Sequence, residues 1–281
     1  MTRPSAPSRV RVRWLGQVPY READDLQRAL LARAADDYLL LLEHPHVYTL
    51  GTNAHALEHV LVPPASVGAE LVRVDRGGDV TYHGPGQLVG YPIVTLPAWR
   101  DGRSDVVAYV RRLEDVLIDV LGDLGVDAHR AGRYTGVWVG EEKIAAIGVK
   151  VARGRTRHGF ALNVDPDLSM FDHIVPCGIP DKGVTSLARL LPSPPDMRGV
   201  VDAVVTRFMT HFAYPEAERQ DVVWRSHPTD LSAFTREAAE RAEVAPVEQA
   251  ERSEAAAVDR SPDSFAGRAE TRVGDPSRPQ G

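Results

Sequence analysis

Short strand patterns and helix patterns alternate irregularly along most of the chain, and this order limits the folds that it can adopt. Strands are predicted where apolar and β-branched residues alternate or run together, at residues 10–15, 37–43, 47–50, 71–74, 88–95, 135–139, 143–151 and 160–164. Helices are predicted where apolar residues recur every three or four positions, at residues 20–34, 104–122, 185–191 and 197–212. Several strand pairs read as hairpins. This order predicts an α+β (mixed α/β) fold and disfavours a regular parallel barrel.

The composition changes near Thr235, where Ala, Glu, Arg, Ser and Pro begin to dominate and apolar residues lose their period. A composition of this kind, with few aromatic residues, is typical of disordered segments. We therefore predict one folded domain over residues 8–230, a length that a single core can cover, and a largely disordered tail over residues 231–281.

Charge and hydropathy exclude some classes of function. The chain has 33 Lys and Arg against 39 Asp and Glu, a net charge of −6 that gives no support for nucleic-acid binding. No apolar stretch approaches the roughly 20 residues of a membrane span, and the N-terminus lacks the pattern of a secretory signal. The single cysteine, Cys177, cannot form an intramolecular disulfide, which fits a reducing compartment. We expect a soluble, cytoplasmic protein.

One glycine-rich segment, RGGDVTYHGPGQ at residues 76–87, lies between two predicted strands. A long hairpin turn explains its glycines but not the Arg, Thr, Tyr and His side chains among them. Glycines let a backbone approach a ligand, and successive backbone N–H groups can bind an oxyanion or a carbonyl oxygen. We therefore predict a binding loop. Within it, His83 can polarise a carbonyl, shuttle a proton or merely cap the turn.

Cys177 and Lys143 are candidates for nucleophilic catalysis. A lone cysteine is often only a small buried hydrophobe, but Cys177 lies between Pro and Gly in a predicted loop, where a thiol can be approached. The local sequence around Lys143, taken alone, favours an ordinary solvated hairpin lysine. A lysine beside a thiol has a specific use, however, because it stabilises a thiolate or takes the thiol proton.

Four histidines lie close together in the sequence, at His44, His46, His55 and His59. Their spacing matches no common zinc pattern, and the only cysteine is distant in the sequence. No metal site is predicted.

Taken together, five segments in this order resemble the lipoyl(octanoyl) transferases of lipoate biosynthesis. They are RGGxxTYHxxGQ at residues 76–87, KIAAIG at 143–148, HGFALN at 158–163, PCG at 176–178 and VTSL at 184–187. The first motif is long and specific, and the order of the others adds to it. The resemblance covers about residues 10–225 and does not include the tail.

The resemblance implies a biotin/lipoate protein ligase-like fold, in which helices flank a mixed sheet. It implies transfer of an octanoyl group from octanoyl-acyl carrier protein to a lysine of lipoyl domains, the first step of endogenous protein lipoylation. The implied acceptors are lipoyl domains of 2-oxoacid dehydrogenases and the glycine cleavage H protein. Because the donor thioester is already activated, no cofactor, ATP or metal is expected.

The resemblance also implies residue roles. The cysteine matching Cys177 carries the acyl thioester, and the lysine matching Lys143 activates it. Ile147 and Phe160 are expected to contribute to an apolar tunnel for the acyl chain. The full set implied to bind substrate is Arg76, Gly77, Gly78, Asp79, Val80, Thr81, Tyr82, His83, Ala146, Ile147, Gly148, Gly159, Phe160 and Ala161.

Three alternatives stay open on the sequence. A lipoate or biotin ligase of the same fold would adenylate a free acid with ATP, and Cys177 would be incidental. A cysteine hydrolase would use Cys177 with His83 or His173 and release free acid. A non-catalytic acyl-binding module would be indifferent to the loss of Cys177.

Overall fold

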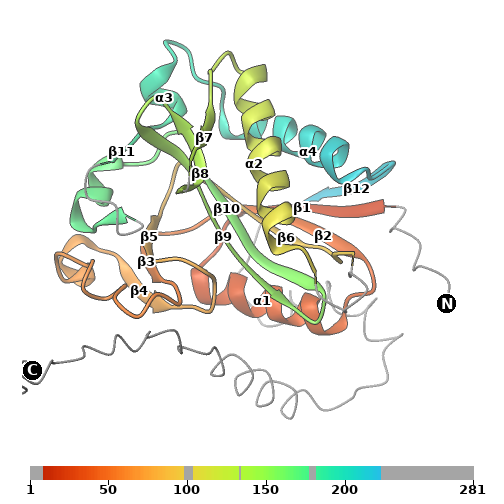
Figure 1. Ribbon diagram of the computed structural model, residues 1–281, viewed down its shortest axis with the longest axis horizontal. Helices are drawn as coiled ribbons and strands as arrows, with labels where there is room; N and C mark the ends of the chain where they lie inside the picture. The colour runs from red at the N-terminus through yellow and green to blue at the C-terminus, as the bar shows by residue number, and fades with distance from the viewer. Residues whose placement is uncertain (1–8, 98–103, 133, 177–181, 223–281) are drawn as a thin grey trace, which may run out of the picture. The chain divides into compact units, whose positions relative to one another are not determined.

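The structure, a computed structural model, describes residues 9–97, 104–132, 134–176 and 182–222 (Figure 1). The predicted nucleophile Cys177 and the predicted tail at residues 231–281 lie outside the described residues.

Within the described residues, the strands form a main sheet of nine strands and a second sheet of three. In spatial order, the main sheet runs β12 (Glu216–Asp221), β1 (Arg9–Gln17), β2 (Asp37–Glu43), β6 (Gln87–Ile93), β10 (Arg155–Asn163), β9 (Glu142–Ala152), β8 (Tyr134–Val139) and β7 (His129–Ala131). The β12, β1 and β2 strands are parallel, whereas the pairs from β2 through β6, β10, β9, β8 and β7 are antiparallel. The short β11 (Gly183–Val184) pairs in parallel with β9. This mixed pairing confirms the predicted fold class.

Helices cover both faces of the main sheet (Figure 1). The α1 helix (Tyr20–Arg33) packs on one face, and α2 (Val106–Asp123) and α4 (Met197–Phe212) pack on the other. Side chains of β2 alternate between these two layers, Leu40 toward α1 and Leu41 toward α2 and α4. A strand covered on both faces has no polar side, which explains its near-continuous apolar sequence. None of the helices in the described ranges has the length and apolar character needed to cross a membrane.

The second sheet consists of β4 (Glu70–Arg73), β3 (Val47–Leu50) and β5 (Val80–His83). Tyr48 of β3 and Tyr82 of β5 pack with Phe171 of the 3₁₀ helix η2 (Leu168–His173). A further 3₁₀ helix, η1 (Pro64–Val67), precedes β4. The strand β5 corrects the expectation of one continuous loop at residues 76–87, because all four of its residues are buried and paired with β3.

The ends of two helices differ from the prediction. Asp105, rather than Ser104, caps α2, with its carboxylate accepting a hydrogen bond from the backbone N–H of Ala108 at 2.8 Å. The helix predicted at residues 185–191 is the shorter α3 (Leu187–Leu190), which Ser186 caps.

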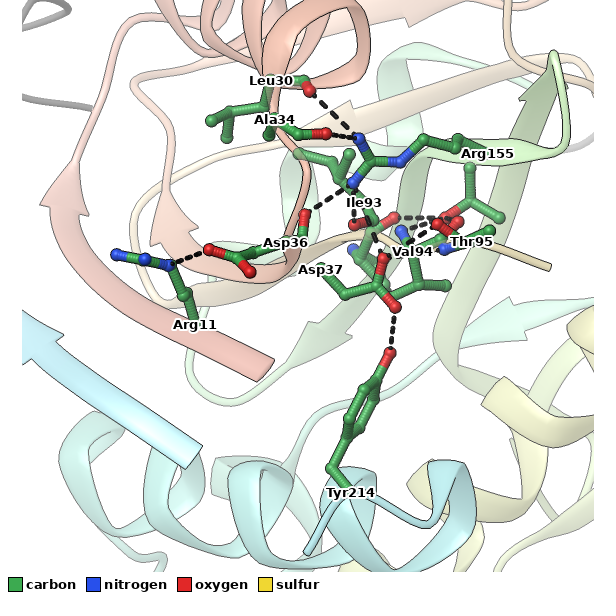
Figure 2. Close-up of polar contacts among 12 residues, drawn as sticks. Arg11, Leu30, Ala34, Asp36, Asp37, Ile93, Val94, Thr95, Arg155 and Tyr214 are labelled. Atoms are coloured by element: carbon green, nitrogen blue, oxygen red, sulfur yellow. Dashed lines mark hydrogen bonds and ion pairs between the residues drawn. The ribbon is translucent and has the colours of Figure 1, made fainter. Parts of the chain in front are cut away.

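A buried polar cluster joins α1 and the segment after α4 to the sheet (Figure 2). The carboxylate of Asp37 accepts hydrogen bonds from the Tyr214 hydroxyl at 2.6 Å and from the Thr95 backbone N–H at 2.9 Å. Arg155 of β10 donates to the carbonyl oxygen of Ala34, just beyond α1. The Asp37 carboxylate and the Arg155 guanidinium each bond to several elements, so they hold these elements in place relative to one another.

Candidate active site

A cavity of about 420 Å³ lies among β9, β10, the loop before β5 and the N-terminal ends of α1 and α2. Its volume falls in the usual range of small-molecule sites. Lys143 lines the cavity, and so does every residue of the implied substrate-binding set except Tyr82. These residues are Arg76, Gly77, Gly78, Asp79, Val80, Thr81, His83, Ala146, Ile147, Gly148, Gly159, Phe160 and Ala161.

Tyr82 lies in the core of the second sheet instead. Its hydroxyl shares a 2.7 Å hydrogen bond with Nδ1 of His46, and its ring packs edge-on against Phe171 with centroids 5.2 Å apart. Side chains alternate along a strand, so Tyr82 points away from its neighbours Thr81 and His83. Its contacts support the cavity wall from behind.

One wall of the cavity comes from the antiparallel pair of β9 and β10. The register sets residues 146–148 directly opposite residues 159–161, so two motifs that are separate in the sequence form one surface. A Cβ atom on Gly148 would lie 3.0 Å from Arg76 Cδ and 3.0 Å from the carbonyl oxygen of Gly77. The absence of a side chain at Gly148 therefore lets the glycine-rich loop pack directly on this wall.

The glycine-rich loop is clamped to the end of β3. The Arg76 guanidinium, on a residue that is 7% exposed, donates from Nη2 to both the carbonyl oxygen and the hydroxyl of Thr49 at 2.8 Å. Gly78 has a φ of +98°, which favours glycine, and a Cβ on Gly51 would lie 2.3 Å from its carbonyl oxygen. These contacts give the loop a fixed shape at the cavity.

Asp79 holds the same loop from within. Its carboxylate accepts hydrogen bonds from Asn53 Nδ2 at 2.6 Å, from His59 Nδ1 at 2.9 Å and from the backbone N–H of Val80 at 2.6 Å. Because these donors come from the chain itself, Asp79 serves mainly to order the loop.

Lys143 is only 8% exposed, although it belongs to a hairpin strand. Its Nζ lies 4.9 Å from the ring centroid of Trp138, a cation–π geometry. The side chain passes Gly136, where an added Cβ would lie 3.4 Å from Lys143 Cε. Its backbone pairs with Val184 of β11, and its carbonyl oxygen accepts a hydrogen bond from the Thr185 N–H at 3.0 Å. Lys143 is thus held by neighbours on both its backbone and its side chain.

His83 is a neutral base at the cavity. Burial, together with the nearby His44 and Arg76, lowers the pKa of His83 well below its usual value. Its Nδ1 lies 2.7 Å from Gln87 Oε1, and its ring stacks on Tyr20 with centroids 6.0 Å apart. At physiological pH the ring therefore carries one proton and no charge.

Two other histidines, His173 and His55, have partners away from the cavity. His173, the alternative base for a hydrolase, shares a 3.1 Å hydrogen bond with Tyr48, and His55 contacts Glu58. Over the described ranges, no group of three or more His, Cys, Asp or Glu side chains is placed to hold a metal ion.

The cavity also has lining residues that the sequence did not single out. Tyr20, Tyr91, Val106 and Val110 line it, and so does His158, which belongs to a quoted motif but not to the implied substrate set. Both valines belong to the apolar period of the helix predicted at residues 104–122, a period typical of a core-facing side. Val106 is 39% exposed, so the apolar face of α2 continues past the core to the cavity.

The chain is similar in sequence to a known family and to proteins of several bacteria. The model of the family described as "Lipoyl protein ligase A/B catalytic domain" matches residues 19–209. The chain is 53% identical over 209 residues to an octanoyltransferase of Solibacter usitatus, covering 72% of this chain and 90% of that one. It is 57% identical over 182 residues to an octanoyltransferase of Gloeobacter violaceus, covering 63% and 79% respectively.

Solved structures share the fold at low sequence identity. A lipoate-protein ligase A bound with ATP superposes with a TM-score of 0.62 at 17% identity, covering 82% of this chain and 94% of that chain. A bipartite lipoate protein ligase of Thermoplasma acidophilum gives 0.60 at 19% identity, covering 82% and 92%. These likenesses confirm the predicted ligase-like fold.

Proposed function

This chain belongs to the octanoyltransferases of the lipoyl protein ligase A/B family, and we propose the following route for the acyl group. It takes octanoyl from octanoyl-acyl carrier protein, holds it as a thioester on Cys177 and delivers it to a lysine of a lipoyl domain. Lys143 is the base in both half-reactions. The acceptors are lipoyl domains of 2-oxoacid dehydrogenases and the glycine cleavage H protein.

In the first half-reaction, Lys143 takes the proton of the Cys177 thiol, and the thiolate attacks the donor carbonyl. Backbone N–H groups of a nearby turn stabilise the tetrahedral oxyanion. The carrier thiolate leaves and takes the proton from Lys143. A thioester replaces a thioester, so the step is nearly balanced in energy.

In the second half-reaction, the neutral amine of the acceptor lysine attacks the Cys177 thioester. Lys143 removes the proton from the attacking nitrogen and returns it to the departing Cys177 sulfur. An amide replaces the thioester, which drives the transfer forward. Two successive displacements on one enzyme group predict ping-pong kinetics.

One observation supports the proposal most directly. Lys143, the glycine-rich loop and the facing segments 146–148 and 159–161 all line the same cavity. Ile147 and Phe160 add apolar surface there. Burial of an octanoyl chain at about 0.8 kcal/mol per CH₂ contributes at most ~5–6 kcal/mol. An apolar wall beside a buried amine suits an acyl thioester.

Chain connectivity is compatible with the pairing of Cys177 with Lys143. Val184, which pairs with Lys143, follows Cys177 by seven residues. A chain of that length spans up to ~25 Å when fully extended, so the sequence separation permits the thiol to reach its proposed base.

Intact-mass spectrometry tests the thioester. After incubation with octanoyl-carrier protein, the full chain should gain one octanoyl group that hydroxylamine releases and that maps to Cys177. Cys177→Ala should fold as the wild type does, by circular dichroism, yet gain nothing and transfer nothing. Normal turnover by that variant would defeat the thioester mechanism.

The same assay separates the alternatives. A ligase of this fold would need ATP and free octanoate, whereas transfer from the carrier protein should proceed without ATP. A hydrolase would release octanoate at the same rate with or without an acceptor lipoyl domain. A non-catalytic acyl-binding module would show no turnover, either in the wild type or in Cys177→Ala.

A further inference from the structure

A chain of buried hydrogen bonds runs from His83 at the cavity to the strand beside Lys143. His83 Nδ1 lies 2.7 Å from Gln87 Oε1, Gln87 Nε2 lies 2.9 Å from Asn163 Oδ1, and Asn163 Nδ2 lies 2.9 Å from the carbonyl oxygen of Thr185. The side chains that form this series of hydrogen bonds are almost wholly buried, with Gln87 2% and Asn163 4% exposed. A buried polar chain of this kind persists only if every donor meets an acceptor.

Two backbone carbonyls fix the donor and the acceptor of every hydrogen bond in this series. The carbonyl oxygen of Thr185 can only accept, so the amide nitrogen of Asn163 must face it and the Asn163 oxygen must face Gln87. The carbonyl oxygen of Tyr82, 3.3 Å from Gln87 Nε2, imposes the same orientation on Gln87. Turning the Asn163 amide would place its oxygen against the Thr185 carbonyl oxygen and its nitrogen against Gln87 Nε2. Turning the Gln87 amide would place its oxygen against both the Tyr82 carbonyl oxygen and the Asn163 oxygen. The Gln87 oxygen therefore faces His83, and only a protonated Nδ1 can bond to it.

We infer that His83 is locked as the tautomer that carries its proton on Nδ1, so that Nε2 acts in the active site only as an acceptor, and that Gln87 and Asn163 are positioning residues that impose this state. The inference deepens the proposed octanoyl transfer, because it states what His83 does there. An unprotonated Nε2 accepts from N–H or S–H groups of the substrates and does not donate to the oxyanion.

The surroundings of Nε2 agree with this assignment. The Thr49 hydroxyl lies 3.5 Å from Nε2, and it already accepts a 2.8 Å hydrogen bond from Arg76 Nη2. Its own proton is therefore free to point toward Nε2 as long as no substrate donor occupies that lone pair. A proton on Nε2 would instead leave Nδ1 bare against the Gln87 oxygen.

The last hydrogen bond of the series, at Thr185, lies next to the backbone of Lys143. The peptide groups of Thr185 bond on both sides, since its N–H donates to the Lys143 carbonyl at 3.0 Å and its own carbonyl accepts from Asn163. Asn163 thus ties the orientation of His83 to the strand pairing that holds Lys143. Loss of Asn163 should disturb His83 even though the two side chains do not touch directly.

Nitrogen NMR of the full chain labelled with ¹⁵N-histidine measures the tautomer directly, without substrate. Between about pH 6 and 8, the His83 signals, assigned with His83→Asn, should show a protonated Nδ1 and a bare Nε2. His44 is the internal reference, because its Nδ1 faces the Val18 carbonyl at 2.7 Å. A protonated Nε2 with a bare Nδ1, or a doubly protonated ring, would overturn the inference.

Two variants test the positioning role. Gln87→Met removes the amide at similar length, and Asn163→Leu releases Gln87 from a distance. In both, His83 should lose its single tautomer while His44 is unchanged. The kcat should fall roughly 10- to 100-fold, the loss seen when an outer partner of a metal-bound histidine is removed, with KM for the carrier protein little altered.

The positioning role of Gln87 and Asn163 requires that kcat and the His83 tautomer change in the same variants. A change of tautomer with an unchanged kcat, or a lower kcat with an unchanged tautomer, would each remove the positioning role. Because the NMR measurement needs no turnover, an inactive wild-type chain would contradict the proposed function and leave the tautomer assignment standing.

Discussion

At the scale of single residues, Lys143 differs from an ordinary hairpin lysine in its burial and its contact with Trp138. A hairpin lysine with no further role stays in water, whereas a catalytic lysine must be held in one position. This placement supports the catalytic interpretation over a solvated lysine.

Lys143→Arg should reduce octanoyl transfer by about 10²- to 10⁴-fold, the usual contribution of a general base. Arginine keeps the positive charge but does not lose a proton at working pH. Single-turnover kinetics with octanoyl-carrier protein measure the effect. Lys150→Arg is the matched control, because Lys150 lies on the same strand and does not line the cavity. Equal rates for the two variants would rule out Lys143 as the base.

His44 should make stability depend on pH in a defined window. It is fully buried, and burial lowers its pKa to about 4, below the value of about 6.5 in an unfolded chain. As pH falls from about 6.5 to 4, the unfolded chain takes up a proton that the folded state refuses. The native state therefore loses roughly 3 kcal/mol from this group over that window and none above it.

Urea denaturation across that pH range checks the effect. His44→Gln should flatten the decline relative to wild type, since glutamine does not titrate. His55→Gln is the control, because the side chain of His55 is 68% exposed. A decline as steep in His44→Gln as in wild type would contradict the assignment.

At the scale of elements, one buried carboxylate joins α2 to the hairpin that carries Lys143. Glu114 is wholly buried and accepts hydrogen bonds from Arg111 and Arg130 at 2.8 Å and from the Gly136 backbone N–H at 3.1 Å. Gly136 is the residue that Lys143 passes. The helix and the hairpin are therefore fixed to each other beside the proposed base.

Glu114→Gln should lower the free energy of unfolding by roughly 1–3 kcal/mol, because it weakens charge-assisted bonds in a buried site. Asp115→Asn is the control, since Asp115 also contacts Arg130 but its side chain is 45% exposed and should contribute under about 1 kcal/mol. Urea melts of both variants make the comparison. Similar losses would show that burial adds nothing to the Glu114 contacts.

Sequence patterns predicted the elements that are buried and regular, and missed those that only pairing creates. The α1 and α4 helices and β2 were expected almost to the residue, because their apolar period is strong. β12, with the sequence EAERQD, has no apolar alternation. It forms because it pairs with β1, where Arg13 donates to Glu218 at 2.8 Å.

The candidate site was predictable to the extent that its residues lie in motifs. Residues 76–83, 146–148 and 159–161 came from such motifs, which carry glycines and polar groups in a recognisable order. Tyr20 and Val110 could not be found in this way, since each fits the apolar stripe of its own helix. Only the packing of helix ends around the cavity assigns them to it.

At the scale of the whole molecule, the lining residues that the structure describes lie between positions 20 and 161, and the family match ends at residue 209. A chain ending at residue 230 should therefore keep its thermal midpoint and its rate of octanoyl transfer. Calorimetry and the transfer assay on the two lengths make the test. A large loss of activity in the shorter chain would assign the tail a catalytic part.

The parallel pairing of β1 with β12 has a consequence for biosynthesis. The outer edge of β1 forms its backbone hydrogen bonds with β12, residues 216–221, which is the last strand that the structure describes. At 5–20 residues per second, a ribosome needs on the order of 10–40 s to reach that point. Throughout that interval β1 presents unpaired backbone groups to other nascent chains. Newly made protein should therefore depend on chaperone protection until synthesis is almost finished.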